Sequence, residues 1–244
     1  MKRSDGRTTE ALRPVRIHVD FTENPLASVL FEMGRTRVLC TVSEELTVPR
    51  FLAGTGRGWV TAEYSLLPGS TDRRSEREAT RGKLSGRTQE IQRLIGRSLR
   101  GVVALDRLGP RTLWIDCDVL QADGGTRTAS VTGAYTALAI AVARLRARGA
   151  IEADPLLDSV AAVSVGIVDG QIVLDLPYEE DSRADVDMNV VATGRGRFVE
   201  VQGTAEQGTF SPEQLAELTR LALAGIGELT RHQADALARA RLDV

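Results

Sequence analysis

The sequence predicts an α+β fold in which two similar βα halves share one core. Segments of alternating apolar and polar residues predict strands, and segments with apolar residues three or four positions apart predict helices. Both kinds of segment occur in each half of the 244 residues, and no linker rich in Pro or Ser separates the halves. We therefore expect residues 1–244 to form a single domain.

The first half is expected to begin with strands and to end with a long helix. Gly34 and Arg35 suit a hairpin turn between two alternating segments. Residues 69–86 are polar and charged, which predicts a long exposed loop. The expected elements are strands at 15–22, 28–33, 36–43, 59–67 and 111–120, and helices at 87–103 and 128–148.

The second half repeats this order of strands followed by a helix. Asp169 and Gly170 form a strong hairpin signal between two β-rich segments. Ser211, Pro212 and Gln214 are typical of a helix start, with Ser as N-cap, Pro at the first position and Gln at the third. The expected strands are 160–168, 171–176, 186–193 and 197–202, and the apolar face of the last helix is Leu215, Leu218, Leu221, Ile226 and Leu229.

Positive charge is concentrated in one segment of a mildly acidic chain. The formal net charge is −2, yet residues 72–111 hold eleven basic residues against five acidic ones. Ten of these eleven are arginines, and the arginine side chain suits bidentate phosphate contacts. This distribution indicates a local anionic partner rather than general adhesion to polyanions.

Other features exclude several classes of protein. No apolar run approaches the roughly 20 residues of a membrane span, and the first residues are polar, unlike a secretory signal. Cys40 and Cys117 lie in apolar, strand-like segments and are expected to be buried free thiols. We therefore expect a cytoplasmic protein without a membrane partner.

Residues 123–128, with the sequence Asp-Gly-Gly-Thr-Arg-Thr, join an expected strand to an expected helix. Free N–H groups at a helix start attract an anion, and the Thr126 hydroxyl and the Arg127 guanidinium would complete a phosphate cradle. An ordinary glycine turn with Thr as helix cap has the same sequence, and spacing alone favours neither interpretation. Arg87, at the head of the preceding helix, by itself indicates only a solvated first-turn residue.

Residues 179–187 contain five carboxylates, interrupted by Arg183 as the one basic residue. Asp185 and Asp187 fall on one face of the expected strand, and Asp181 lies on the loop before it. Magnesium binds through one or two carboxylates together with phosphate oxygens of a substrate. A solvated acidic turn is the alternative, which spacing alone slightly favours.

The motifs that the sequence lacks exclude several types of catalysis. His18 and His232 are the only histidines, and neither lies near a nucleophile motif. The chain has no Gly-x-Ser-x-Gly, zinc-ligand or dinucleotide pattern. A phosphate cradle, a carboxylate cluster and a basic segment together indicate phosphoryl-type chemistry that depends on positioning and a metal.

Seven sequence blocks, in order along the chain, resemble the ribonuclease PH family. They include Ser-Gly-Arg-Thr-Gln-Glu-Ile-Gln-Arg-Leu-Ile-Gly-Arg at 85–97 and Asp-Cys-Asp-Val-Leu-Gln-Ala-Asp-Gly-Gly-Thr-Arg-Thr at 116–128. The resemblance implies the ribonuclease PH fold, also called ribosomal protein S5 domain 2-like. The remaining blocks are at 3–7, 12–14, 58–65, 185–191 and 200–204.

The resemblance also implies an activity. Such an enzyme is a phosphorolytic 3′→5′ exoribonuclease that trims the 3′ end of tRNA precursors and releases nucleoside diphosphates, and its reverse reaction adds nucleotides. Inorganic phosphate is the co-substrate, and Mg²⁺ is the cofactor, with Mn²⁺ able to replace it. The implied assembly is a homo-hexamer, a trimer of dimers, of one catalytic domain per chain.

Site residues follow from the resemblance by position. Arg87, Gly125, Thr126 and Arg127 would bind phosphate, Asp181 and Asp187 would bind the metal and carry its acid–base role, and Arg73, Arg74, Arg77 and Arg81 would contact RNA.

Two other interpretations start from the same fold. A non-catalytic RNA-binding ring subunit of an exosome-like assembly would keep the fold but usually lose the aspartates or the Gly-Thr-Arg turn, which are present here. A ribosome-associated binding module of similar topology is more remote. One departure from the family is residues 51–54, Phe-Leu-Ala-Gly, where a tryptophan and basic residues usually stand.

Overall fold

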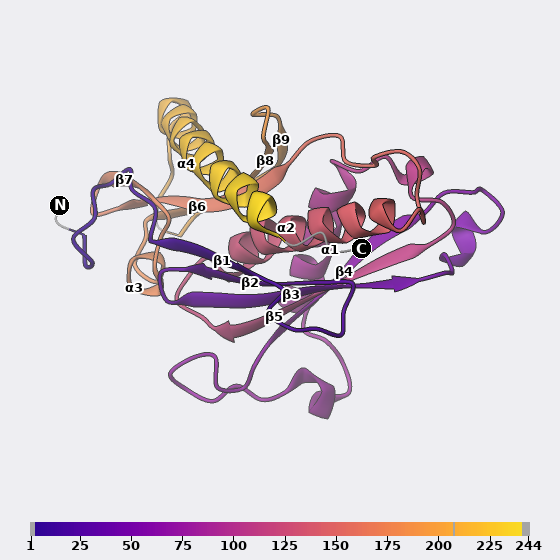
Figure 1. Ribbon diagram of the computed structural model, residues 1–244. Helices are drawn as coiled ribbons and strands as arrows, with labels where there is room; N and C mark the ends of the chain where they lie inside the picture. Colours follow the sequence, from indigo (N-terminus) through magenta and orange to yellow (C-terminus); the bar gives the residue numbers. More distant parts are fainter. Residues whose placement is uncertain (1–2, 207, 241–244) are drawn as a thin grey trace.

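The computed structural model describes residues 3–206 and 208–240, except for the side chains of Ala79 and Arg81. Its strands and long helices occur in the order that the hydrophobic patterns predict, whereas its short helices were not predicted (Figure 1). In chain order they are β1 Val15–Val19, β2 Ala27–Met33, β3 Thr36–Glu45, η1 Arg50–Leu52, β4 Trp59–Leu66, η2 Glu78–Arg81, α1 Gly86–Arg100, η3 Leu105–Arg107, β5 Thr112–Gln121, α2 Thr126–Ala147, β6 Val160–Val168, β7 Gln171–Leu174, α3 Tyr178–Asp181, β8 Val186–Thr193, β9 Phe198–Ala205 and α4 Pro212–Arg239.

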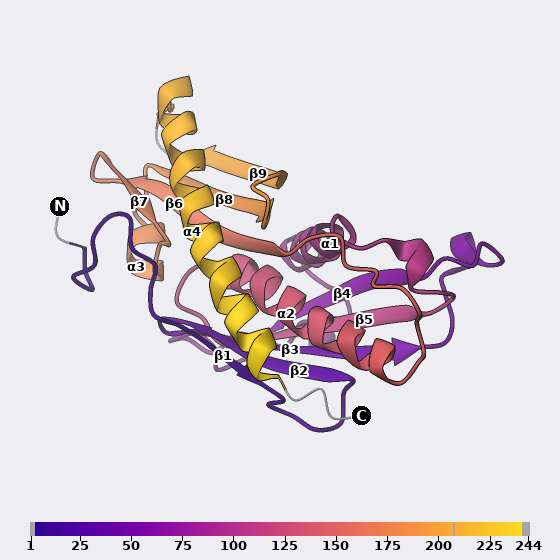
Figure 2. The same ribbon diagram turned by 45° about the horizontal axis from the view of Figure 1, so that its top comes forward.

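The described strands form two sheets (Figure 2). The first has the order β1-β2-β3-β5-β4, and the second has the order β7-β6-β8-β9. Pairing is antiparallel except between β4 and β5, which run parallel. A parallel pair needs a long crossover connection, and α1 provides it.

Helix α2 lies between the sheets and contacts both of them (Figures 1 and 2). It packs closely on the first sheet because Gly133 has no side chain: a Cβ there would lie 2.8 Å from the Cys40 Sγ atom and 2.9 Å from the Phe31 Cβ atom. Among the described helices, α2 alone is long and apolar enough to cross a membrane, but it is almost wholly buried inside this fold. Helix α4 covers β6 and β7 and reaches β1.

One continuous apolar core contains residues of both sheets and of α1, α2 and α4. It includes the buried residues Ile91, Leu94, Ile95 and Leu99 of α1 and all but one residue of the predicted face of α4. The exception is Leu215, which lies in the first turn of α4 and is 38% exposed.

The turn and cap predictions are confirmed. Gly34 has a φ of 58°, and Asp169 and Gly170 have φ values of 49° and 72°, all in the left-handed region. Ser211 and Gln214 form a reciprocal capping box at the start of α4. Cys40 and Cys117 are buried free thiols on paired strands. The expected loop at 69–86 contains one short helical turn, η2, which its charge pattern does not signal.

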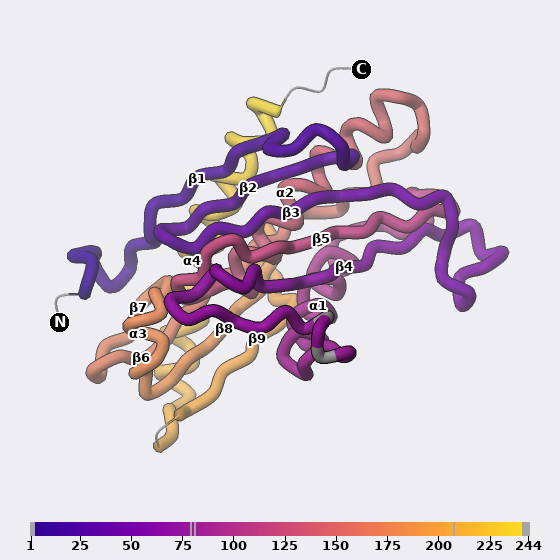
Figure 3. Tube along the Cα trace, turned by 90° about the horizontal axis from the view of Figure 1, so that it is seen from below, coloured from indigo at the N-terminus to yellow at the C-terminus, as the bar shows by residue number. Residues whose placement is uncertain are grey.

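The elements that carry the predicted site residues meet at one end of the first sheet. Strand β5 ends on the side of the molecule where α3 lies, and the turn from β5 into α2 touches the backbone that leads into α3 (Figure 1). Seen from below, the loop between β4 and α1 passes close to this region (Figure 3).

Candidate active site

The turn between β5 and α2 is built from two glycines in the left-handed region. Gly124 has a φ of 72° and Gly125 a φ of 65°, which side chains other than glycine rarely adopt. A Cβ on Gly124 would lie 2.4 Å from the carbonyl oxygen of Leu176, so glycine also permits the close approach to the segment before α3. We call residues 123–127 the phosphate turn.

The phosphate turn presents free donors. Within the described residues, the backbone N–H groups of Gly125, Thr126 and Arg127 donate to no other group. They stand at the start of a 22-residue helix, where the helix dipole adds partial positive charge. This arrangement suits an anion such as phosphate.

The side chain of Thr126 is held by a tyrosine on β4. The Thr126 Oγ1 atom lies 2.8 Å from the Tyr64 hydroxyl oxygen, and both groups are buried. Burial raises the pKa of the Tyr64 phenol, while Thr126 and the charges of Arg87 and Arg127 act in the opposite direction. Tyr64 therefore stays neutral and can hold the threonine hydroxyl in one orientation.

Arg127 is fixed by two polar side chains from other elements. Its Nη1 atom donates to the Glu90 Oε1 atom at 3.2 Å and to the Gln202 Oε1 atom at 2.9 Å. The Gln202 amide also donates to Glu90 at 3.1 Å, which closes the network. A guanidinium has five N–H donors, so Arg127 keeps donors for a ligand while its position is fixed.

Arg87 lies in the first turn of α1, and its side chain is exposed. Burial raises the pKa of both Tyr64 and Asp181, and the positive charge of Arg87 opposes both rises, so Arg87 lies near enough to act on both groups. The structure therefore brings Arg87 to the same place as Arg127, although the two residues lie forty positions apart in the chain.

The two predicted metal ligands line one cleft. Asp181 ends α3, and Asp187 is the second residue of β8. Burial, and then the negative charge of Asp187, raise the pKa of the Asp181 carboxyl, while Arg87, Arg127 and Arg13 oppose this rise. The cleft has a volume of about 410 Å³, and its lining is Asp181, Ser182, Arg183, Ala184, Asp187 and Glu206.

This pair of carboxylates fits a hard divalent cation. Two carboxylates that repel each other in a partly buried cleft are stabilised by a cation between them, and magnesium often takes only one or two protein carboxylates. In the part of the chain that the structure describes, no cluster of three or more His, Cys, Asp and Glu side chains forms a richer site. Asp185 does not line the cleft.

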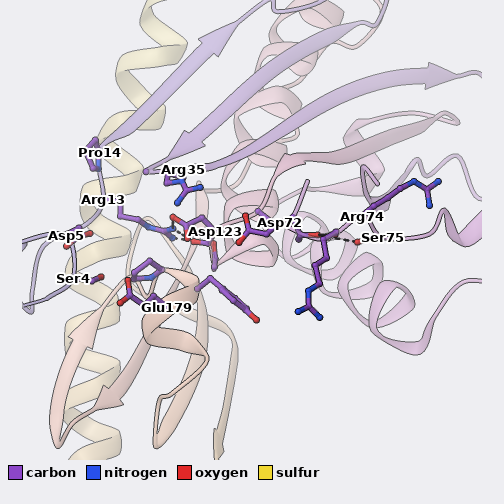
Figure 4. A pocket seen from close by; sticks show the side chains of 17 residues that line it. Ser4, Asp5, Arg13, Pro14, Arg35, Asp72, Arg74, Ser75, Asp123 and Glu179 are labelled. Carbon is purple, nitrogen blue, oxygen red and sulfur yellow. Dashed lines mark hydrogen bonds and ion pairs between the residues drawn. The ribbon is translucent and has the colours of Figure 1, made fainter. Parts of the chain in front are cut away.

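The four arginines predicted to contact RNA are not all placed alike. Arg73 and Arg74 line a separate, larger cavity of about 1110 Å³ that is bounded on one side by Asp123 and Gly124 of the phosphate turn (Figure 4). Arg77 is exposed outside that lining. The side chain of Arg81 lies outside the described residues. The carboxylate cleft holds the two predicted metal ligands, whereas the larger cavity borders the phosphate turn.

Several residues of the site carried no functional signal in the sequence. Tyr64 and Gln202 lie on strands, in blocks that resemble the family, but nothing in their spacing indicated contact with Thr126 or Arg127. Arg13, which donates to the Gly124 carbonyl oxygen of the phosphate turn, also lies in such a block.

Phe51, the departure from the family pattern, packs edge-on against Trp59 with 5.2 Å between ring centroids. Trp59 begins β4, whereas Tyr64 lies near its end.

Fold and site together define a class of protein in which a glycine turn that suits an anion and a pair of carboxylates that suits a metal lie where two βα halves meet. The chain belongs to the 3′ exoribonuclease family: the family model of domain 1 matches residues 11–143, and that of domain 2 matches residues 158–225.

Its relatives within that family are ribonuclease PH proteins. Ribonuclease PH of Corynebacterium kroppenstedtii is 59% identical over 237 residues, which cover 97% of this chain and 93% of the relative. Ribonuclease PH of Bacillus subtilis is 58% identical over 236 residues, which cover 96% of each chain. The predicted family and the predicted phosphate-dependent 3′ exoribonuclease activity are confirmed, and the non-catalytic alternative is not favoured.

Solved structures show the same fold at low identity. Rice (Oryza sativa) Rrp46 superposes with a TM-score of 0.77 at 18% identity, covering 96% of this chain and all of that one. A chain of the Archaeoglobus fulgidus exosome with RNA bound to the active site superposes with a TM-score of 0.76 at 22% identity, covering 94% of this chain and 92% of that one. The predicted fold class is confirmed.

Proposed function

We propose that this protein trims the 3′ ends of tRNA precursors by phosphorolysis at the site formed by the phosphate turn and the carboxylate cleft. The observation that carries this assignment is that both parts influence one carboxyl group: burial and then the charge of Asp187 raise the pKa of Asp181, and the charges of Arg87 and Arg127 oppose that rise. One small region therefore offers fixed positive charge for an attacking phosphate and paired carboxylates for a metal.

The reaction exchanges one phosphate ester bond for another. An oxygen of inorganic phosphate forms a bond to the phosphorus of the terminal linkage, and the bond from that phosphorus to the 3′ oxygen of the preceding nucleotide breaks. The products are a nucleoside diphosphate and an RNA shortened by one nucleotide, whose 3′ oxygen takes up a proton. No covalent enzyme intermediate is needed, which agrees with the lack of a histidine-activated nucleophile.

The main barrier that the protein must lower is repulsion between anions. Two unit charges about 4 Å apart repel by about 1 kcal/mol in water and by several times more in a drier site. Arg87, Arg127 and the free N–H groups of the phosphate turn offset the charge of the attacking phosphate. The position of Arg127 is set before phosphate arrives, because Glu90 and Gln202 already hold its side chain.

The two carboxylates would act on the RNA, which is the second reactant. Asp181 and Asp187 would hold Mg²⁺, or Mn²⁺ in its place, and we also assign the acid–base role to this pair. The bound ion would supply positive charge beside the scissile linkage and the leaving oxygen. Arg73, Arg74, Arg77 and Arg81 would hold the RNA backbone, which the position of Arg73 and Arg74 beside the phosphate turn supports.

Further proposals concern the state of the protein in the cell. We propose a cytoplasmic homo-hexamer, a trimer of dimers, in which residues 1–244 act as one catalytic domain. The continuous core across both halves supports the single domain, and two free thiols suit a reducing compartment. Phe198 and Val201, which are 49% and 41% exposed on the edge strand β9, are available to a subunit interface.

The test of the function is the identity of the released nucleotide. The protein is incubated with 3′-extended tRNA and Mg²⁺, with and without inorganic phosphate, and the products are separated by charge. We expect nucleoside diphosphates that depend on phosphate. Nucleoside monophosphates formed without phosphate would show a hydrolase and refute the assignment.

A further inference from the structure

A buried arginine, Arg13, binds the backbone carbonyl groups of the phosphate turn. The Arg13 Nη1 atom donates to the carbonyl oxygen of Asp123, and its Nη2 atom donates to that of Gly124 at 3.4 Å. Figure 4 shows the Arg13 side chain directed toward Asp123. Arg13 is only 4% exposed, so it is not a surface group that happens to lie near the turn.

A buried threonine holds the same turn from β3. The Thr36 Oγ1 atom donates to the Gly124 carbonyl oxygen at 2.7 Å and accepts a hydrogen bond from the Asp123 N–H group at 3.0 Å. Thr36 is the first residue of β3 and is fully buried. The carbonyl of Gly124 therefore has two donors, Arg13 and Thr36, on the same side of the turn.

These contacts fix which way the peptide groups face. In a trans peptide, the carbonyl of one residue and the N–H of the next point in opposite directions, and no described peptide is cis. With the Gly124 carbonyl held by Arg13 and Thr36, the Gly125 N–H must point away from them. Two consecutive glycines allow this peptide to flip easily, and a flipped carbonyl would face the anion and repel it.

The network that positions Arg13 extends to the carboxylate side of the site. The Arg13 Nη2 and Nε atoms donate to the two carboxylate oxygens of Asp175, at 2.6 and 2.9 Å. Arg3 donates to the Asp175 carbonyl at 2.8 Å and to the Glu180 carboxylate at 2.7 Å. Glu180 is buried in α3 beside Asp181, so the same chain of contacts reaches the element that carries a metal ligand.

We infer that Thr36 and Arg13 are positioning residues that set the affinity for the attacking phosphate by locking the peptide between Gly124 and Gly125. This inference rests on the proposed function, because it takes the phosphate turn as the site of the co-substrate. It concerns residues that do not touch phosphate themselves and act only through the turn.

Thr36→Val tests the inference with little change in volume. The variant keeps the shape and β-propensity of the side chain but removes the hydroxyl. We expect the KM for phosphate to rise roughly fivefold, the effect of losing the hydrogen bond that holds the Gly124 carbonyl oxygen, with a smaller effect on kcat at saturating phosphate. Thr36→Ser keeps the hydroxyl and should restore a KM close to that of the wild type.

Thr112→Val is the matched control. Thr112 is also a buried first residue of a strand, and its hydroxyl donates to the Thr47 carbonyl oxygen at 2.7 Å. It lies at the opposite end of β5 from the phosphate turn. Thermal unfolding of all three variants measures the stability lost with each hydroxyl, and the shift in Tm on adding phosphate measures anion binding without turnover.

The outcomes separate the alternatives. A raised phosphate KM and a weaker phosphate-induced Tm shift in Thr36→Val, but not in Thr36→Ser or Thr112→Val, support the inference. Equal loss of Tm in both valine variants with an unchanged phosphate KM would show a purely structural role and overturn it. Failure of the proposed function gives a different result, because the wild-type protein would then release no diphosphates.

Discussion

Arg127 offers the sharpest test of how the site binds phosphate. Its guanidinium keeps donors for a ligand while Nη1 is held by Glu90 and Gln202. Arg127→Lys preserves the positive charge but replaces a planar fork of donors with a single ammonium group. The variant therefore separates the contribution of hydrogen-bond geometry from that of charge alone.

The expected fall in kcat/KM for phosphate can be worked out from the hydrogen bonds that Arg127→Lys removes. A hydrogen bond that involves a charged group contributes about 1.5–3 kcal/mol. Losing one such bond to the attacking phosphate lowers kcat/KM for phosphate by roughly ten- to a hundredfold, since about 1.4 kcal/mol corresponds to a factor of ten. The Arg127 side chain is only 15% exposed, so water replaces the lost bond poorly.

The assay measures nucleoside diphosphate release from 3′-extended tRNA at a series of phosphate concentrations and fixed Mg²⁺. Arg144→Lys is the matched control, because Arg144 lies on the same helix and pairs with the Asp20 carboxylate at 2.7 Å. It stands seventeen residues further along α2, or about 25 Å away. Arg144→Lys should retain the wild-type kcat/KM for phosphate.

One result would refute the reasoning. If Arg127→Lys kept the wild-type dependence on phosphate, net charge would suffice and the guanidinium geometry would be irrelevant. A fall of equal size in both lysine variants would point to a general loss of folding instead of a loss of phosphate contact.

Three further predictions concern the rest of the site. Asp187→Asn should abolish turnover, a loss of at least a hundredfold, yet leave tRNA binding nearly intact, as measured by rate and by filter binding. Asp181→Asn should raise the Tm of metal-free protein at neutral pH, because the pKa of Asp181 is raised in the folded state. Stability contributed by a raised pKa is present at low pH and lost as pH rises through the folded value, so the gain should vanish on acidification. Replacing Arg73, Arg74 and Arg77 together by Ala should weaken RNA binding and reduce the slope of log K against log salt by about 2 to 3.

Each of these predictions has a control and a contrary outcome. Asp154→Asn changes an exposed carboxylate outside the site and should leave both turnover and stability unchanged. Full activity of the Asp187 variant with Mg²⁺ would remove the metal assignment, and a lower metal-free Tm for the Asp181 variant would contradict the repulsion between the two carboxylates. Replacing Arg195, Arg231 and Arg239 removes the same charge elsewhere, and an equal change in salt slope would show that RNA binding depends on overall charge.

Much of the secondary structure could be predicted because local chemistry determines it. Strands β6 and β8 have the predicted bounds, since both are continuous or alternating apolar segments between clear turns. The capping box at Ser211 also depends only on residues close together in the chain. Leu215 belongs to the predicted apolar face but is partly exposed, because helical spacing predicts a face and not how far along the helix neighbouring elements cover it.

The sequence by itself determined the family, the order of elements and the residue types that suit phosphate and metal, since all of these are carried by contiguous segments. It left open whether the glycine turn was a cradle and whether the acidic segment was a solvated turn. Only the tertiary structure brings Arg87, Arg127, Asp181 and Asp187 together and places Arg13 and Thr36 behind the turn. Such contacts join residues that are far apart in the chain, and their charges interact strongly only once folding has removed the water between them.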